Sequence, residues 1–307
     1  MPPRREKKSA PPGALFTSWR LPNLKSLWML VAGFLFSCMG IFVKVGSEHF
    51  SSAELVFYRS VFGLAVLYAM VVAQRLPLRT RHFRNHAWRG LTGMVALLLF
   101  FHTISILPLA TAITLNYTSP LFFAFLMVVV LGERPRPLLI AALLSGFGGV
   151  VLLLQPGFQQ ELWRTQLLGV LAGGLSGFAY LNVKQLGKLG EPEWRVVFYF
   201  TLISSLGSAL WMSGKTWHTI GWNEAWILLG LGVTATLAQL ALTRAHHEGD
   251  SLVVGALAYS TVIFASLWGV LLWQEVLSWQ EWAAIAIIVL SGIVAARAAS
   301  RAAVEQD

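Results

Sequence analysis

The stretch AELVFYRSVFGLAVLYAM, residues 53–70, is largely apolar, yet Arg59 lies inside it. A guanidinium group binds a carboxylate or phosphate through paired hydrogen bonds, so an arginine in apolar surroundings is suited to holding an anion. When such a stretch crosses a membrane, its charged side chain usually faces the protein interior or a wet cavity. We therefore predict that Arg59 and its neighbour Tyr58 contact an anionic part of a substrate. The alternative is that Arg59 extends to the lipid headgroups and has only a structural role.

Three further charged residues lie near the same end of this stretch. Glu54 is five residues before Arg59, and Lys44 precedes Glu48 by one helical turn in the preceding apolar segment. Charges of both signs around an opening suit gating or coupling, so Lys44 and Glu54 are candidates for that role. The alternative is a salt-bridge network that only stabilises this end of the molecule.

Two glutamates, Glu133 and Glu275, each follow an apolar run, in the sequences VVVLGE and VLLWQE. The helix dipole disfavours a carboxylate at the C-terminal end of a helix, so another interaction must retain each of them. The favoured interpretation is hydrogen bonding to the next helix. The alternative is proton coupling by a partly desolvated carboxylate. His102, in another apolar segment, is a candidate proton relay, although a hydrogen bond to a neighbouring helix is the favoured role.

Uncharged polar groups occupy the middle of two other apolar segments. Asn116 and Tyr117 precede Pro120, whose ring removes one backbone hydrogen bond from a helix. Tyr259 and Ser260 occupy the same level in a later segment. Amide, aromatic and hydroxyl groups that converge from two segments suit a small ligand with an apolar body and polar ends. We predict that these four residues bind substrate; the alternative is that they join helices by hydrogen bonds.

The segments that position these residues follow from the composition. The chain has 307 residues, of which 56% are hydrophobic and 12% charged, whereas a soluble domain is about 25% charged. The apolar residues form runs of roughly 18–22 residues, each long enough to cross a hydrocarbon layer of about 30 Å as a helix. Backbone groups in lipid must be satisfied within the segment, and the runs lack the alternation of a barrel strand, so helix is the predicted structure. The ten predicted segments are 27–47, 53–73, 89–107, 110–131, 137–154, 166–184, 195–213, 223–242, 251–273 and 279–297.

The net charge of +9 is explained by topology. With the N-terminus in the cytoplasm, nineteen Lys and Arg residues fall on the inner side and two, Arg164 and Lys215, on the outer side. This bias follows the positive-inside rule and predicts a multi-pass protein of the plasma (inner) membrane with both termini cytoplasmic. Because topology and anionic lipid account for the basic excess, nucleic acid is not a predicted partner, and the lipid bilayer is.

The two halves of the sequence resemble each other. The alignments are NYTSPLFFAFLMVVVLGE (116–133) with AYSTVIFASLWGVLLWQE (258–275) at an offset of 142, VAGFLFS (31–37) with LAGGLSG (171–177) at an offset of 140, and VFYRS (56–60) near VFYFT (197–201). Each half holds five predicted segments, an odd number, so the second half enters the membrane from the opposite side. Inverted repeats of this kind enclose the substrate site of many secondary transporters, with access alternating between the two faces. The predicted organisation is a basic cytoplasmic tail (1–26), two five-helix repeats (27–155 and 166–297) and a second cytoplasmic tail (298–307).

Ten helices in two inverted sets of five, the P…LGE ending of the fourth segment with its counterpart WQE in the ninth, and the arginine of the second segment resemble the drug/metabolite transporter superfamily, EamA type. The resemblance covers about residues 27–297. It implies a secondary carrier, often an exporter, for a small organic metabolite. The chain departs from the pattern at Val262, the counterpart of Pro120, because such proteins often carry proline in both copies. A symmetric pair of kinks is therefore left open.

Glycines at a spacing of four residues occur in the segment at 166–184, and two further glycines, Gly146 and Gly149, occur in the segment before it. Small residues allow helix backbones to approach closely in lipid. We predict that Gly169, Gly173 and Gly177 serve helix packing.

Two other protein classes compete with a carrier. A membrane-embedded lipid-modifying enzyme acting on pyrophosphates needs paired aspartates, whereas the chain has only Asp250 and Asp307. The run HHEGD (246–250) has no second histidine one turn after the glutamate, so no metal site is predicted. A channel needs a repeated pore helix or a ring of like charges, and neither is visible. We therefore predict a transporter without catalytic residues or cofactor, preferentially an exporter, with a proton as first candidate for coupling and a monomer or homodimer as the assembly.

Overall fold

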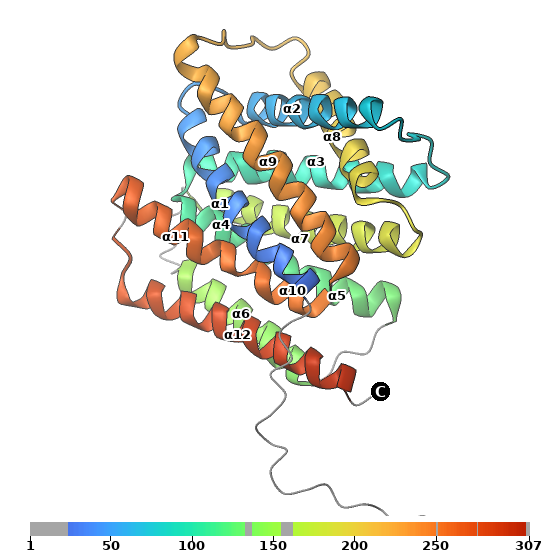
Figure 1. The fold of residues 1–307 in the computed structure, drawn as a ribbon. Helices are drawn as coiled ribbons and strands as arrows, with labels where there is room; N and C mark the ends of the chain where they lie inside the picture. Colours follow the sequence, from blue (N-terminus) through green and yellow to red (C-terminus); the bar gives the residue numbers. More distant parts are fainter. Residues whose placement is uncertain (1–23, 133–136, 155–161, 250, 275, 305–307) are drawn as a thin grey trace, which may run out of the picture.

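The structure, a computed structural model, describes residues 24–132, 137–154, 162–249, 251–274 and 276–304. Within these ranges every regular element is a helix (Figure 1), which confirms the all-α fold that the apolar runs predict. In chain order the elements are η1 (Leu24–Leu27), α1 (Trp28–Gly46), α2 (Ser52–Ala73), α3 (Phe83–Ile106), α4 (Leu109–Asn116), α5 (Ser119–Leu131), α6 (Pro137–Leu154), α7 (Trp163–Lys188), α8 (Glu193–Trp211), α9 (Trp222–Glu248), α10 (Ser251–Ala258), α11 (Ser260–Trp273) and α12 (Trp279–Val304).

Among the described residues, five stretches of helix are each long and apolar enough to cross a membrane: α1 with the turn before it, α2, α3, α7 and most of α9. The pairs α4–α5 and α10–α11 each coincide with one predicted apolar segment. Two residues separate α4 from α5, and one residue separates α10 from α11. When each pair is counted as one interrupted helix, the elements correspond in order to the ten predicted segments. The number of membrane crossings itself stays a prediction.

Both interrupted helices break at equivalent places in the two repeats. Between α4 and α5 the Thr118 amide donates to the Leu115 carbonyl (N–O 3.2 Å), and Pro120 has no amide to continue the ladder. Between α10 and α11 the Val262 amide donates to the Tyr259 carbonyl (3.0 Å), three residues back instead of four. A symmetric pair of interruptions therefore exists, although only the first repeat has a proline there. In the first repeat, Pro120 interrupts the helix because it lacks an amide donor. In the second repeat, a tighter 3₁₀-type turn at Val262 interrupts the helix at the equivalent place.

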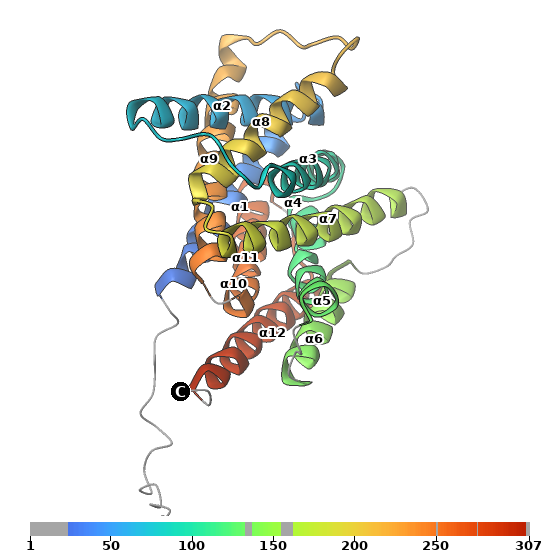
Figure 2. The ribbon, with the colours of Figure 1, turned by 90° about the vertical axis from the view of Figure 1, so that its right-hand side faces the viewer.

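Helices of the two halves pack through one another and do not form two separate bundles. α1 packs against α9, and the equivalent pair is α7 against α3; likewise α2 against α9 corresponds to α8 against α3. The pairs α2–α8 and α6–α12 join equivalent helices directly. Figures 1 and 2 show the α6–α12 pair at one side of the molecule and α2 with α8 at the other. Exchanging each helix for its counterpart preserves the main contacts, so a pseudo-two-fold axis relates the repeats. This axis passes through the α2–α8 contact and through the α6–α12 contact.

Glycines let helices approach both interruptions closely. A Cβ atom at Gly173 of α7 would collide with the Thr118 side chain and would lie 3.0 Å from the Leu115 carbonyl oxygen. A Cβ atom at Gly33 of α1, the repeat counterpart of Gly173, would lie 2.7 Å from the Thr261 hydroxyl oxygen. The predicted packing role of Gly173 is confirmed, and Gly33 has the same role in the first repeat. The other predicted glycines behave alike: Gly169 and Gly177 face α4 and α5, and Gly146 and Gly149 face α12.

Candidate functional site

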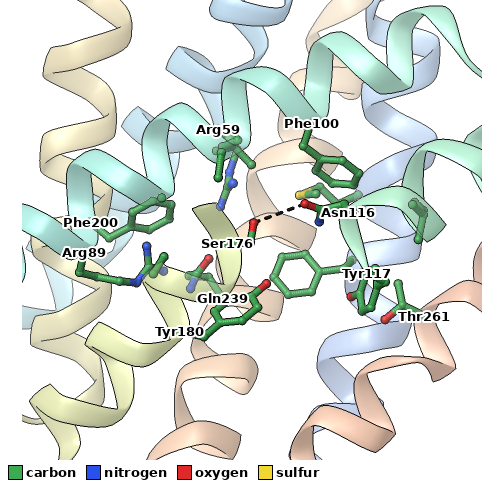
Figure 3. Close-up of a pocket in the computed structure, with 17 residues that line it drawn as sticks. Arg59, Arg89, Phe100, Asn116, Tyr117, Ser176, Tyr180, Phe200, Gln239 and Thr261 are labelled. Carbon is green, nitrogen blue, oxygen red and sulfur yellow. Dashed lines mark hydrogen bonds between the residues drawn. The ribbon is translucent and has the colours of Figure 1, made fainter. Parts of the chain in front are cut away.

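A cavity lies between the repeats, beside the first interruption. Helices α1 to α4 of the first repeat and α7, α8, α9 and α11 of the second contribute to its wall. Figure 3 shows side chains from both repeats around the same space. The lining residues within the described ranges are Phe36, Met39, Arg59, Arg89, Gly93, Ala96, Leu97, Phe100, Ile113, Asn116, Tyr117, Ser176, Ala179, Tyr180, Phe200, Gln239 and Thr261.

Several lining residues are repeat counterparts of one another. At the offset of 140 between α1 and α7, Phe36 corresponds to Ser176, and both line the cavity. The alignment of VFYRS with VFYFT pairs Arg59 with Phe200, and both line it again. Counterparts meet only close to the axis that relates the repeats. The cavity therefore lies on that axis, where inverted-repeat transporters place their substrate.

Two buried arginines face this cavity from the first repeat. Arg59 on α2 and Arg89 on α3 are each 3% exposed. Their guanidinium carbons lie 5.8 Å and 4.1 Å from the centroid of the Phe200 ring, within the range of cation–π attraction. The sequence points to Arg59 but not to Arg89, because the predicted segment begins at residue 89 and leaves this arginine at the loop. Helix α3 begins at Phe83, which places Arg89 well inside the helix.

Uncharged polar groups complete the lining. The Ser176 hydroxyl donates to the side-chain oxygen of Asn116 at 3.3 Å, joining the two repeats (Figure 3). Tyr117, directly after α4, and Tyr180 on α7 line both this cavity and a smaller one, so their rings separate the two spaces. Three of the predicted substrate contacts, Arg59, Asn116 and Tyr117, therefore share one cavity.

The other predicted substrate contacts lie elsewhere. Tyr58 packs in an aromatic cluster, with its ring centroid 6.2 Å from that of Trp217. Tyr259 and Ser260 lie at the second interruption but are not among the described residues that line the cavity, whereas Thr261 is. Successive helical residues point about 100° apart, so a shift of one residue decides which side chain reaches the space.

Glu54 and Lys44 do not line the cavity; each of them binds backbone groups at the end of a helix. The Glu54 carboxylate accepts hydrogen bonds from the Ser51 amide (2.8 Å), which completes a capping box at the start of α2, and from the His218 amide (2.7 Å) between α8 and α9. The Lys44 ammonium donates to the carbonyl oxygen of Leu107 at 2.9 Å, directly after α3. Glu54 thus joins the start of α2 to a loop of the other repeat, a position outside the cavity that suits a gate.

The lysine interaction recurs in the second repeat. Lys44 also lies 3.3 Å from the Ile104 carbonyl oxygen, and its counterpart Lys184 lies 3.5 Å from the carbonyl oxygen of His246. Ile104 and His246 are separated by the repeat offset of 142. A cation near the C-terminal end of a helix is favoured by the helix dipole, so these lysines stabilise α3 and α9 in the same way.

The remaining coupling candidates do not reach the cavity or lie outside the described residues. His102 is exposed on α3. Glu133 and Glu275 lie outside the described ranges. The residues directly before them, Gly132 and Gln274, are repeat counterparts and both adopt left-handed backbone, with φ of 68° and 54°. The two helices that lead to the glutamates therefore end in the same conformation, at the cost of strain at Gln274.

A second charged cluster lies beyond the opposite end of α2. Glu191, between α7 and α8, accepts hydrogen bonds from Arg195 (2.8 Å) and from the Thr80 hydroxyl, and it lies 3.5 Å from His86. Burial opposes ionisation of Glu191, but the hydrogen bonds from Thr80 and Arg195 outweigh it and lower the pKa of this carboxyl. The sequence gives no sign of the cluster, because Thr80 and Glu191 are 111 residues apart. In the part of the chain that the structure covers, no three His, Cys, Asp or Glu residues gather to hold a metal ion.

One protein-family model matches the chain twice. The model described as "EamA-like transporter family" matches residues 23–155 and again residues 163–297. The two matches coincide with the two halves that surround the cavity, and together they cover most of the chain.

Individual relatives match over most of their length. The chain is 29% identical over 260 residues to the pseudopaline exporter CntI of Pseudomonas aeruginosa, which covers 83% of this chain and 90% of that protein. It is 30% identical over 235 residues to a riboflavin transporter of Rhizobium johnstonii, with 75% and 76% covered. It is 27% identical over 279 residues to an uncharacterized transporter of Helicobacter pylori, with 87% and 93% covered. One solved crystal structure has the same fold, with a TM-score of 0.73 at 24% identity over 91% of this chain and 99% of that chain.

Proposed function

The chain belongs to the EamA-like transporter family, and we propose from this premise that it is a secondary carrier of a small organic metabolite, working by alternating access between its two inverted repeats. It is a membrane transporter and not an enzyme. Export is the proposed direction, and the similarity to a pseudopaline exporter supports it.

The observation that carries this proposal is the cavity on the pseudo-two-fold axis. Its wall contains residues from both repeats at equivalent positions, such as Phe36 with Ser176 and Arg59 with Phe200. Because each repeat packs through the other, a rocking motion that opens the cavity toward one face closes it toward the opposite face. The substrate then meets the same side chains in both states.

The two charged clusters suit the ends of such a pathway. Glu54 binds His218 at the start of α2, and Glu191 binds Thr80 and Arg195 beyond its other end. Each cluster joins a segment of one repeat to a segment of the other. We propose that the Glu54 cluster closes the outer side and the Glu191 cluster closes the inner side.

The proposed topology follows from the distribution of basic residues. It places the protein in the plasma (inner) membrane with both termini in the cytoplasm and the loop containing His218 outside. Reporter tags on the two ends of the chain test it. A C-terminal tag on the side opposite to the N-terminal tag would contradict the inverted arrangement.

The proposed substrate contacts are Arg59, Asn116 and Tyr117, which share the cavity, with a proton as the proposed coupling ion. The test compares metabolites in the medium and in cells with and without overexpression of the chain. Uptake of each candidate compound into inverted membrane vesicles, with and without an imposed pH gradient, then measures saturation and coupling. Uptake that does not saturate would indicate a channel, and a chemically altered product would indicate an enzyme.

A further inference from the structure

Arg59 and Arg89 place two like charges in one buried space. Both guanidinium carbons lie over the Phe200 ring, 5.8 Å and 4.1 Å from its centroid, so they are at most about 10 Å apart. Like charges repel strongly at this separation in a medium of low dielectric constant, and burial also removes their hydration. An arrangement of this kind requires negative charge nearby.

The surrounding side chains do not supply that charge within the described ranges. None of the described lining residues is acidic. The Nε atoms of both Arg59 and Arg89 are buried without a hydrogen-bond partner among the described residues. Glu54 and Glu191 are instead bound at the helix ends by the contacts described above. The negative charge is therefore expected to arrive with a ligand.

The position of Arg89 depends on a glycine in the same helix. A Cβ atom at Gly93, one turn further along α3, would collide with Nη1 of Arg89. Gly93 itself lines the cavity. The missing side chain leaves the room that the guanidinium group occupies beside the cavity, so an alanine at this position would displace the charge without removing it.

The rest of the wall suits an organic ligand more than a bare inorganic ion. Asn116 and Gln239 offer amide groups that both donate and accept hydrogen bonds. Phe36, Phe100 and Phe200 offer apolar surface. A cavity with apolar walls and a few polar groups at defined places is typical of sites for small organic molecules.

We propose that the substrate is a small organic dianion, a short carbon skeleton that carries two carboxylate groups, and that Arg59 and Arg89 each bind one of them. A planar guanidinium group matches a carboxylate through two parallel hydrogen bonds. Two such groups within about 10 Å can be met by two acids on one short skeleton, whereas a monoacid leaves one cation uncompensated. This inference rests on the proposed transport function and specifies its substrate class.

The first test measures the thermal unfolding midpoint of the purified full-length protein in detergent. The probes are the dicarboxylates succinate, glutarate and adipate, the monocarboxylate butyrate and the neutral glutaramide, at matched concentration and ionic strength. At least one dicarboxylate should raise the midpoint in a saturable manner, because a ligand that binds the folded state stabilises it. An equal shift with butyrate, or no shift with any dicarboxylate, overturns the proposal.

Variants connect the shift to the two arginines. Arg59→Gln and Arg89→Gln should each weaken the apparent affinity for the dicarboxylate by at least about tenfold. Gly93→Ala keeps both charges but displaces Arg89, so it should also weaken binding, and it remains informative when Arg89→Gln does not fold. Arg84→Gln, at an exposed position of α3, is the matched control and should bind as the unaltered protein does. Unchanged binding in both arginine variants contradicts the inference.

Metabolite export separates failure of this inference from failure of the proposed function. Overexpression should enrich the medium in compounds that carry two acidic groups at pH 7. Saturable export of neutral or cationic compounds alone would overturn the dianion site and leave the carrier intact. Dicarboxylate binding that depends on Arg59 and Arg89, without transport of any compound, would overturn the carrier and leave the site intact.

Discussion

The wall that the first repeat contributes to the cavity differs from the wall that the second repeat contributes. Arg59 and Arg89 both belong to the first repeat, and at the position equivalent to Arg59 the second repeat has Phe200. The frame around these side chains is nevertheless shared. Both repeats have an interrupted helix, a glycine packed against it, and a lysine on the first helix whose ammonium group contacts a carbonyl near the C-terminal end of the third helix.

The difference separates two requirements of a carrier. Exchange between two access states needs a frame in which equivalent helices can adopt each other's arrangement. Selective binding needs unlike walls, because polar groups at defined places hold a ligand in one orientation. Substitutions in the walls should therefore change transport, and substitutions in the frame should change stability.

The largest effect is expected at the charged wall. Arg59→Ala should lower the initial transport rate of the exported compound about 100-fold or more, since loss of one partner of a buried ion pair costs about 3 kcal/mol. Membrane insertion should be unchanged. Uptake into inverted vesicles, normalised to the amount of inserted protein, measures this effect, and Arg84→Ala on exposed helix surface is the control. Transport that is unchanged in Arg59→Ala would show that this buried residue does not bind the substrate and has only a structural role.

A substitution in the frame should mainly reduce stability. Gly173→Ala should lower the free energy of unfolding by about 2–3 kcal/mol, because its Cβ atom would meet the Thr118 side chain and the Leu115 carbonyl. Gly174→Ala is the matched control, since the nearest atoms to its Cβ belong to the Phe122 ring at 3.8 Å, and its effect should stay within about 0.5 kcal/mol. Thermal unfolding in detergent measures both.

The equivalent glycine of the first repeat sharpens this comparison. Gly33→Ala should destabilise less than Gly173→Ala, because the nearest atoms to its Cβ are the hydroxyl groups of Thr261 and Ser260, which can rotate away. Equal losses for Gly173→Ala and Gly174→Ala would show that close packing at the first interruption does not stabilise the frame.

The neutral wall should contribute less to binding than the charged wall. Phe200→Leu keeps an apolar side chain but removes the aromatic face that both guanidinium groups share, so affinity for the transported compound should fall about fivefold. Phe200→Tyr keeps that face and should bind nearly as well as the unaltered protein. Affinity from saturable vesicle uptake measures the change. A loss in Phe200→Leu as large as that in Arg59→Ala would contradict the division between the walls.

The smallest effect is expected at the cluster around Glu191, outside the cavity. The pKa of Glu191 is lowered by folding, so its ionised form stabilises the protein above the ordinary carboxyl pKa of about 4.3, and this stabilisation is lost as the pH falls through the lower folded-state value. Glu191→Gln keeps a carbonyl oxygen for one of the two donors, Thr80 or Arg195, but places an NH2 group opposite the other, and it should cost about 1 kcal/mol at pH 7.

The difference between Glu191→Gln and the unaltered protein should therefore narrow as the pH falls below the ordinary carboxyl pKa of about 4.3. Arg195 is the cationic side chain that faces this carboxylate, and the imidazole ring of His86 lies 3.5 Å from it. Unfolding midpoints in detergent from pH 3.5 to pH 8 check the prediction, with the exposed Glu48→Gln as control. A difference that is independent of pH would show that the shape of the side chain, and not its charge, matters here.

Part of the site could be predicted from sequence because its signals are local. Arg59 stands out as a charge in an apolar stretch, and Asn116 and Tyr117 stand out beside a proline in mid-segment. All three line the cavity. Arg89 did not stand out, because the start of a helix is poorly marked where basic and apolar residues mix. The predicted segment starts at residue 89, whereas α3 starts six residues earlier, at Phe83, so Arg89 lies inside the helix and not in the loop before it.

Length, apolarity and repetition along the chain were enough to determine an all-α membrane protein of two related halves, because each segment must satisfy its own backbone in lipid and an odd number of predicted segments in each half inverts the second half. Only the tertiary structure decided that Arg89 joins Arg59 over Phe200, that Thr261 and not Tyr259 lines the cavity, and that Thr80 meets Glu191. The direction of a side chain depends on where its helix begins and breaks. Contact between distant segments depends on how the helices cross, and neither property is encoded in local composition.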